Sequence, residues 1–174
     1  PMSRQHGVET RDMWREVSRP RIDATMEVAG KATQLWLRQQ VEAFEVLDQS
    51  NIPSVLIHGD ISPENLLTDH RGRLCGVIDF AEARLSDPAL DFAGILHRFT
   101  WRDLEVVLAN YDAPVDATLL ERTRIYIAIS PVYSVTDGYV ALGTGERIAG
   151  LRRLAARAAR ETRNKRVALI VPSS

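Results

Sequence analysis

The chain has 174 residues, which is enough for one domain or for one lobe of a larger protein. Its 22 basic and 23 acidic side chains leave a net charge of −1, which argues against a nucleic-acid or membrane-surface protein held by bulk charge. One cysteine excludes an internal disulfide and a cysteine-rich zinc site, and no apolar run is long enough to span a bilayer. We therefore expect a cytoplasmic protein without nucleic-acid or membrane partners.

The hydrophobic pattern predicts helices at the start of the chain and short strands in its centre. Residues 10–19 form a short candidate helix that Pro20 ends, and apolar residues spaced by three and four predict a long amphipathic helix over 22–47. The centre has three short apolar runs typical of strands, at 54–57, 66–67 and 74–78. The polar segment 69–73 between the last two contains a glycine and predicts a hairpin turn.

The remaining chain again has the pattern of helices. Asp87 and Pro88 are typical of an N-cap and a first helical residue, and they predict a helix that ends near residue 98. Further helices are expected over about 103–111, 116–142 and 146–166. Pro131 lies inside the second of these and should kink or split it. The fold class predicted is therefore α+β and mainly helical, with a small β-hairpin.

Three oxygen-bearing side chains are predicted to converge at one end of this hairpin. Asp60 lies on a loop that leaves a strand, Asn65 stands where the chain enters the next one, and Asp79 ends the returning strand. Asn65 and Asp79 offer the hard oxygen ligands that suit Mg²⁺, which also takes water and phosphate oxygens. Asp60 is free to accept a proton from a hydroxyl nucleophile. Such a site suits phosphoryl transfer, in which positioning and charge neutralisation do most of the catalysis.

The order of these elements resembles the catalytic and metal-binding segments of the kinase fold. The pattern comprises residues 58–60 (HGD), Asn65 after four further residues, and a strand that ends at 78–80 (IDF). With residues 87–91 (DPALD), the form HGD is similar to the aminoglycoside phosphotransferase family, which includes macrolide phosphotransferases and, more distantly, choline kinases. The resemblance implies the C-terminal lobe of the kinase-like fold and an antibiotic-resistance kinase.

The same resemblance implies a role for each residue of the motif. Asp60 is expected to be the catalytic base, and Asn65 and Asp79 are expected to bind Mg²⁺ with ATP or GTP as the phosphate donor. Asp91 is expected to hold the catalytic loop through backbone hydrogen bonds, and His58 to pack and hydrogen-bond under that loop. The expected partner is a small molecule with a hydroxyl group.

A finer resemblance concerns the substrate. Residues 77–88 are similar to macrolide phosphotransferases and to one group of aminoglycoside phosphotransferases, and residues 129–133 and 141–143 resemble the substrate-binding helices of macrolide enzymes. This likeness implies a set of pocket residues: Tyr126, Tyr133, Asp137 and Tyr139. The alternative is that the segment is a kinked core helix.

The sequence contains no nucleotide-cradling lobe. The chain has only two lysines, Lys31 and Lys165, as candidates for the phosphate-binding lysine of a kinase. Residues 28–31 (VAGK) resemble the strand that carries it, but they lie in a helical pattern, no glycine-rich turn precedes them, and too few residues separate them from Asp60. We therefore expect residues 1–174 to form a single C-terminal lobe that lacks its N-terminal partner and is inactive, or nearly so, alone.

The sequence also leaves two other classes of function open. A catalytically silent scaffold or binding module could keep the lobe, although the intact Asp60, Asn65 and Asp79 argue against decay. A metal hydrolase would need a metal cluster formed by His58 and His97 with Asp79 and Asp91, and no HxxxH spacing supports it. Within the same superfamily, a kinase for choline or another metabolite is the alternative to an antibiotic kinase.

Overall fold

A computed structural model describes residues 9–47, 52–97, 99–137 and 144–170, with side chains up to residue 164. The chain forms two compact units. The first unit consists of the described part of residues 1–13 and 48–127, and the second of the described part of 14–47 and 128–174.

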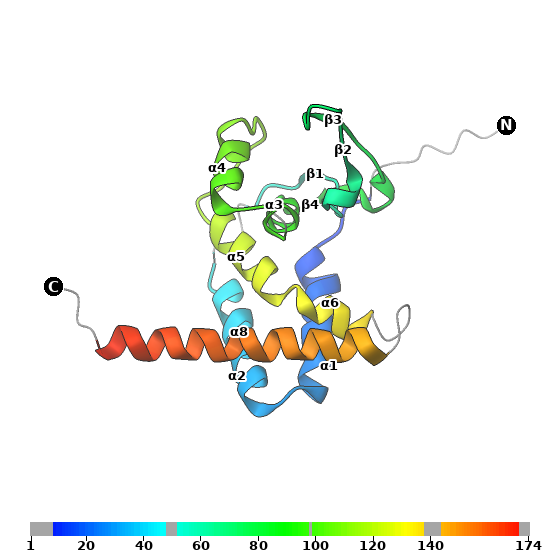
Figure 1. The fold of residues 1–174 in the computed structure, drawn as a ribbon. Coiled ribbons are helices and arrows are strands. Elements are labelled where there is room, and N and C mark those ends of the chain that lie inside the picture. The colour runs from blue at the N-terminus through cyan, green and yellow to red at the C-terminus, as the bar shows by residue number, and fades with distance from the viewer. Residues whose placement is uncertain (1–8, 48–51, 98, 138–143, 171–174) are drawn as a thin grey trace. The chain divides into compact units, whose positions relative to one another are not determined.

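The first unit contains two small antiparallel sheets (Figure 1). Strand β1 (Val55–Ile57) pairs with β4 (Arg84–Ser86), and strand β2 (Leu66–Thr68) pairs with β3 (Leu74–Val77) in the predicted hairpin. Asp69 closes the hairpin turn by accepting hydrogen bonds from the backbone N–H groups of Arg71 and Arg73, at 2.9 and 3.0 Å. The sequence pattern does not predict β4, because Leu85 is the only apolar residue in its three positions.

Three helices follow the sheets: α3 (Ala89–Leu96), α4 (Trp101–Ala109) and α5 (Leu119–Ile129). The Asp87 carboxylate accepts the Ala89 N–H at 2.9 Å, which caps α3 near the predicted start. Helix α4 begins two residues before the predicted position, because Thr100 and Asp103 form a reciprocal capping box.

The buried side chain of Arg122, on α5, forms ion pairs with Asp87, which precedes α3, and with Asp116, which precedes α5. Arg122 is 0% exposed. Its guanidinium donates to both carboxylate oxygens of Asp87, at 2.8 and 3.0 Å, and to both of Asp116, at 2.7 and 2.8 Å. Hydrogen bonds from Arg122 hold the pKa of Asp116 well below its ordinary value. Burial alone would lower the pKa of Arg122, but the hydrogen bonds to Asp116 and Asp87 more than offset this and raise it.

The second unit is helical. A π-helical turn (Trp14–Ser18) leads into α1 (Arg19–Val28), and α2 (Lys31–Glu45), α6 (Pro131–Thr136) and α8 (Thr144–Ile170) follow. The rings of Trp14 and Phe44 stack with their centroids 3.7 Å apart. In the described part of the chain, no helix combines the length and apolar composition that crossing a membrane requires.

Two predictions about helix boundaries in this unit are wrong, and one is confirmed. Pro20 does not end a helix, because it stands at the start of α1, where its missing N–H costs no helical hydrogen bond. The expected single helix over 22–47 is broken at Ala29 and Gly30, whose ψ angles of 152° and 155° are extended. The interruption at Pro131 is confirmed, since α5 ends at Ile129 and α6 begins at Pro131.

Candidate functional site

The backbone of the loop after β1 donates hydrogen bonds to a carboxylate on α3. The Asp91 side chain accepts the backbone N–H of His58 at 2.7 Å and the backbone N–H of Gly59 at 2.9 Å. Burial raises the pKa of Asp91, and the two backbone N–H donors oppose that rise. Asp91 therefore fixes the loop backbone immediately before Asp60.

The imidazole of His58 connects the loop to the end of the hairpin. His58 is buried, its Nε2 donates to the backbone carbonyl of Ile78 at 2.9 Å, and its Nδ1 accepts the Asp60 N–H at 3.3 Å. A carbonyl accepts only and an N–H donates only, so this pattern defines the neutral ring with its proton on Nε2. The ring of Phe80 lies against it, with centroids 4.6 Å apart.

Asn65 completes a closed circuit of hydrogen bonds. Its amide nitrogen donates to the backbone carbonyl of Asp60 at 2.9 Å and to the Asp60 carboxylate at 3.3 Å. Its backbone carbonyl accepts the Ile78 N–H at 3.0 Å. The circuit runs from His58 to Ile78, Asn65 and Asp60 and back to His58, so it joins the loop to the residue before Asp79.

Asp79 stands in an unusual backbone conformation at the end of this circuit. Its φ of 62° and ψ of 63° lie in the left-handed region, and no other non-glycine residue in the described ranges has a positive φ. Such strain persists where the surroundings impose it and clusters at functional sites. The Asp79 side chain is exposed, so its carboxylate is accessible to a ligand.

The donor set fits magnesium bound together with a nucleotide. The amide nitrogen of Asn65 is engaged by Asp60, which leaves the amide oxygen of Asn65 and the carboxylate of Asp79 as hard donors. In the described residues, no cluster of three or more His, Cys, Asp or Glu side chains could hold a metal ion by itself. In proteins, Mg²⁺ usually binds one or two carboxylates and completes its coordination with water and phosphate oxygens.

Two glycines shape the backbone of the site. Gly59 has a φ of +82°, and a Cβ at this position would lie 2.4 Å from the carbonyl oxygen of Glu82. On α3, a Cβ at Gly94 would lie 2.6 Å from the carbonyl oxygen of Ile61, so the glycine allows the helix to approach the loop. The motif HGD contains the first of these glycines, whereas Gly94 carries no signal in the sequence apart from being a glycine inside a helix.

Gly59→Ala is expected to destabilise the first unit by about 1–3 kcal/mol, because the methyl group meets both a positive φ and the Glu82 carbonyl. Urea denaturation measures this loss. Gly72→Ala is the matched control, because Gly72 also has a positive φ, of +74°, but no atom lies within 4 Å of its Cβ position. Equal losses in the two variants would mean that the close approach to Glu82 contributes nothing.

Three of the four residues predicted to line a substrate pocket lie in the described chain, and each is described within its own unit. Tyr126 is 4% exposed and belongs to the first unit. In the second unit, the Tyr133 hydroxyl hydrogen-bonds with Ser18 at 2.9 Å, and Asp137 accepts two hydrogen bonds from Arg21 Nη2 at 3.0 and 3.1 Å. Tyr139 lies outside the described residues. These contacts are those of packing residues, and the assignment to a pocket stays a prediction.

A family model matches the segment that holds the site, and one curated protein is similar over part of the chain. A family model described as "Phosphotransferase enzyme family" matches residues 4–126, which include Asp60, Asn65, Asp79 and Asp91. Over 85 residues, the chain is 39% identical to the uncharacterized protein YcbJ of Bacillus subtilis (strain 168), which covers 48% of this chain and 27% of that protein.

Solved structures with the same fold are phosphotransferases. The GDP complex of wild-type aminoglycoside 2'-phosphotransferase-IIIa is 23% identical and superposes with a TM-score of 0.74 over 89% of this chain and 54% of its own. Macrolide 2'-phosphotransferase type I is 24% identical, with a TM-score of 0.69 over 85% of this chain and 50% of its own. The kinase-like fold class predicted from the sequence is confirmed, and the chain spans about half the length of these structures.

Proposed function

We propose that this chain, which belongs to the phosphotransferase enzyme family, is the C-terminal lobe of an ATP- or GTP-dependent small-molecule O-phosphotransferase. Its acceptor is proposed to be the hydroxyl group of an aminoglycoside or macrolide antibiotic. The observation that carries the proposal is the hydrogen-bond circuit that links Asp60 and Asn65 to Ile78, the residue before Asp79.

Asp60 is the residue proposed to act on the acceptor. Its side chain is exposed, while its backbone is fixed on both sides by the Asp91, His58 and Asn65 contacts. The Asn65 amide donates to one carboxylate oxygen of Asp60, which orients the carboxylate and leaves the other oxygen to accept the proton of the acceptor hydroxyl. A rigid base of this kind contributes mainly through positioning.

Asn65 and Asp79 are proposed to hold Mg²⁺ through their amide and carboxylate oxygens. When bound, the ion would neutralise the charge of the nucleotide phosphates. The left-handed backbone at Asp79 turns the chain sharply between Val77, the last residue of β3, and the helical turn Phe80–Glu82. This turn presents the exposed carboxylate at the end of the hairpin that also positions Asn65.

Asp79→Asn is expected to weaken divalent-metal binding in the presence of nucleotide by at least about tenfold, because a carboxylate ligand is lost. Electron paramagnetic resonance of free Mn²⁺ measures the affinity for the full-length protein with GDP. Glu105→Gln is the matched control, because it removes one exposed carboxylate from α4 outside the site. Unchanged Mn²⁺ affinity in Asp79→Asn would contradict the assignment of Asp79 as a ligand.

The proposal also includes the missing half of the enzyme. The structures with the same fold are about twice as long as the matched segment. The proposed base and metal ligands, Asp60, Asn65 and Asp79, act on the acceptor and on the metal, so the proposed enzyme also needs a group that holds the nucleotide. We propose that a separate N-terminal lobe supplies the nucleotide clamp.

A further inference from the structure

The buried ion pair between Arg122 and Asp87 is joined to the first turn of α3. The Oδ1 atom of Asp87 accepts hydrogen bonds from Arg122 Nη2 at 3.0 Å and from the Ala89 N–H at 2.9 Å, and its Oδ2 accepts Arg122 Nε at 2.8 Å. Ala89 is the first residue of α3 and is fully buried. The guanidinium on α5 therefore holds the carboxylate that caps α3, so it fixes the position where this helix begins.

Asp91 lies one turn after this anchor, and its own backbone N–H donates to the Pro88 carbonyl at 3.1 Å. Gly94 follows Asp91 by three residues, so both lie on the same face of α3. That face meets the loop after β1 closely, because a Cβ at Gly94 would lie 2.6 Å from the carbonyl oxygen of Ile61. A displacement at the start of α3 would therefore also displace the Asp91 carboxylate relative to the loop.

The Asp91 carboxylate is the contact through which α3 acts on the loop. It accepts the backbone N–H groups of His58 and Gly59 at 2.7 and 2.9 Å, directly before Asp60. Such hydrogen bonds weaken quickly when the distance or the angle changes. Catalysis by a positioned group is equally sensitive, because a displacement of about 1 Å can lower a rate about a hundredfold.

We propose that Arg122 and Asp87 are positioning residues for the loop that carries Asp60. Their ion pair fixes the start of α3, and α3 fixes the loop backbone through Asp91. Neither residue is proposed to contact the acceptor, the nucleotide or the metal. The effect on turnover rests on the proposed function, whereas the effect on the loop backbone rests on the geometry alone.

The first variant is Asp87→Asn in the full-length protein, which removes the charge that pairs with Arg122 and replaces one acceptor by a donor at nearly constant size. The Gly59 amide resonance is expected to shift in NMR spectra of protein labelled with ¹⁵N-glycine. We expect kcat for phosphate transfer to fall by at least about tenfold. The KM for nucleotide should stay within about threefold of the wild type, because no proposed nucleotide contact changes.

Asp116→Asn is the matched control, because Asp116 is the second carboxylate on Arg122. The two side chains are similarly buried, at 15% exposed for Asp116 and 10% for Asp87. Within the described residues, the side-chain hydrogen bonds of Asp116 come from Arg122 and Thr118 and not from α3 or the loop. This variant should lose stability as Asp87→Asn does, yet keep the Gly59 resonance and a kcat within about twofold of the wild type.

Asp87→Glu tests the same link if Asp87→Asn does not fold. The glutamate keeps a negative charge beside Arg122, so the buried cation stays paired. Its carboxylate is one methylene further from the backbone, and glutamate is not a favoured N-cap residue, so the contact with the Ala89 N–H is weakened. The Gly59 resonance should shift again, and kcat should fall by at least about threefold.

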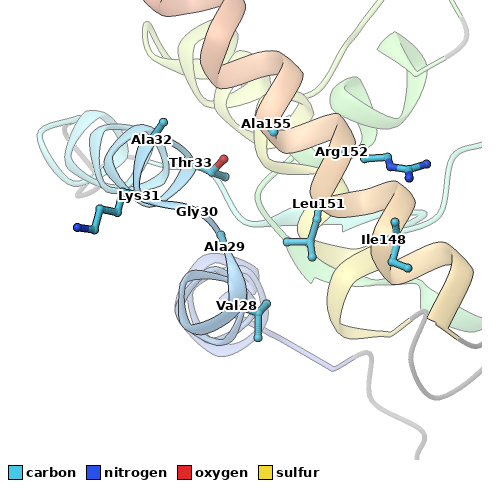
Figure 2. A pocket seen from close by; sticks show the side chains of 10 residues that line it. All are labelled: Val28, Ala29, Gly30, Lys31, Ala32, Thr33, Ile148, Leu151, Arg152 and Ala155. Carbon is cyan, nitrogen blue, oxygen red and sulfur yellow. The ribbon is translucent and has the colours of Figure 1, made fainter.

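Thr33→Val controls for a buried substitution of nearly constant size in the second unit. Thr33 is 5% exposed and lies at the start of α2, where it lines a hollow of about 520 Å³ between α2 and α8 (Figure 2). None of the residues that line this hollow belongs to the candidate site. This variant should therefore keep both the Gly59 resonance and the kcat of the wild type.

Two results would overturn the proposal. One is an unchanged Gly59 resonance in both Asp87→Asn and Asp87→Glu. The other is an equal loss of kcat in Asp87→Asn and Asp116→Asn, which would reduce the effect to lost stability. A shifted Gly59 resonance, together with a wild-type protein that transfers no phosphate, would support the link to the loop and contradict the proposed function instead.

Discussion

Asp60→Asn is expected to lower kcat for antibiotic phosphorylation by about a hundredfold to ten-thousandfold in the full-length protein, because it removes the proposed base. The side chain of Asp60 is exposed and its backbone contacts do not depend on the carboxylate, so the variant should keep its fold. A radiolabelled phosphate-transfer assay at saturating nucleotide measures the change. A kcat within about threefold of the wild type would contradict the role of Asp60 as the base.

The control for this variant separates chemistry from binding. If Asp60 acts only on the transferred proton, the KM for nucleotide should stay within a few-fold of the wild type while kcat falls. Thermal unfolding should show no loss of stability, because the lost carboxylate accepts only a long hydrogen bond of 3.3 Å from Asn65. A variant that melts early would instead indicate that Asp60 supports the loop.

Arg122→Met is expected to destabilise the first unit by about 3–5 kcal/mol, because it leaves Asp87 and Asp116 partly buried without their cation. That loss is a large part of the 5–15 kcal/mol by which a domain is usually stable. Urea denaturation measures it. Arg124→Met, on the same helix, is the matched control, because Arg124 is exposed and stacks on the Trp101 ring at 4.9 Å. We expect that control to lose no more than about 1 kcal/mol.

The ion pairs of Arg122 also make the stability of the folded chain depend on pH. Arg122 depresses the pKa of Asp116 below the ordinary 3.8. The unfolded chain therefore binds a proton at higher pH than the folded chain does. The contribution of Asp116 to stability is complete above about pH 5 and is lost as the pH falls below about 4 toward the folded-state pKa. In Arg122→Met this part of the acid dependence should become smaller, because only the hydrogen bonds from Thr118 would still lower the pKa of Asp116.

The residues of the candidate site could be proposed from the sequence because they are close to one another along the chain. Asp60, Asn65 and Asp79 lie within one loop and one hairpin, and local pairing of β2 with β3 places Asn65 beside Ile78, the residue before Asp79. The backbone atoms that complete the circuit carry no sequence signal, since the Ile78 carbonyl would accept a hydrogen bond whatever its side chain. Their role follows only from the fold.

Elements that depend on distant contacts were harder to predict. Strand β4 is specified by pairing with β1, some 30 residues earlier, rather than by its own composition. The break between α1 and α2 is stabilised by Gln34, whose side-chain amide donates to the carbonyls of Met26 and Ala29, both at 2.9 Å. Periodicity alone continues through this break, because the apolar positions on both sides keep helical spacing.

The partners of Tyr133 and Asp137 show the same limit of local sequence pattern. Tyr133 and Asp137 suit a polar or aromatic pocket by type, yet both have partners from α1 or the turn before it, namely Ser18 and Arg21. Sequence position places them on or next to α6 but does not reveal those partners, which are more than 100 residues away. Spatial pairing at this separation cannot be read from local pattern.

We propose that this chain supplies the base and metal ligands of a phosphotransferase and needs a nucleotide-binding lobe for activity. The most direct measurement is phosphate transfer by the full-length protein and by residues 1–174 side by side. The acceptors are aminoglycosides, macrolides and choline, each tested with ATP and with GTP. We predict that the full-length protein phosphorylates an antibiotic and that the isolated chain transfers almost nothing. Turnover by the isolated chain at the full-length rate would contradict the need for a second lobe. No transfer by either protein would contradict the proposed activity and favour a silent scaffold.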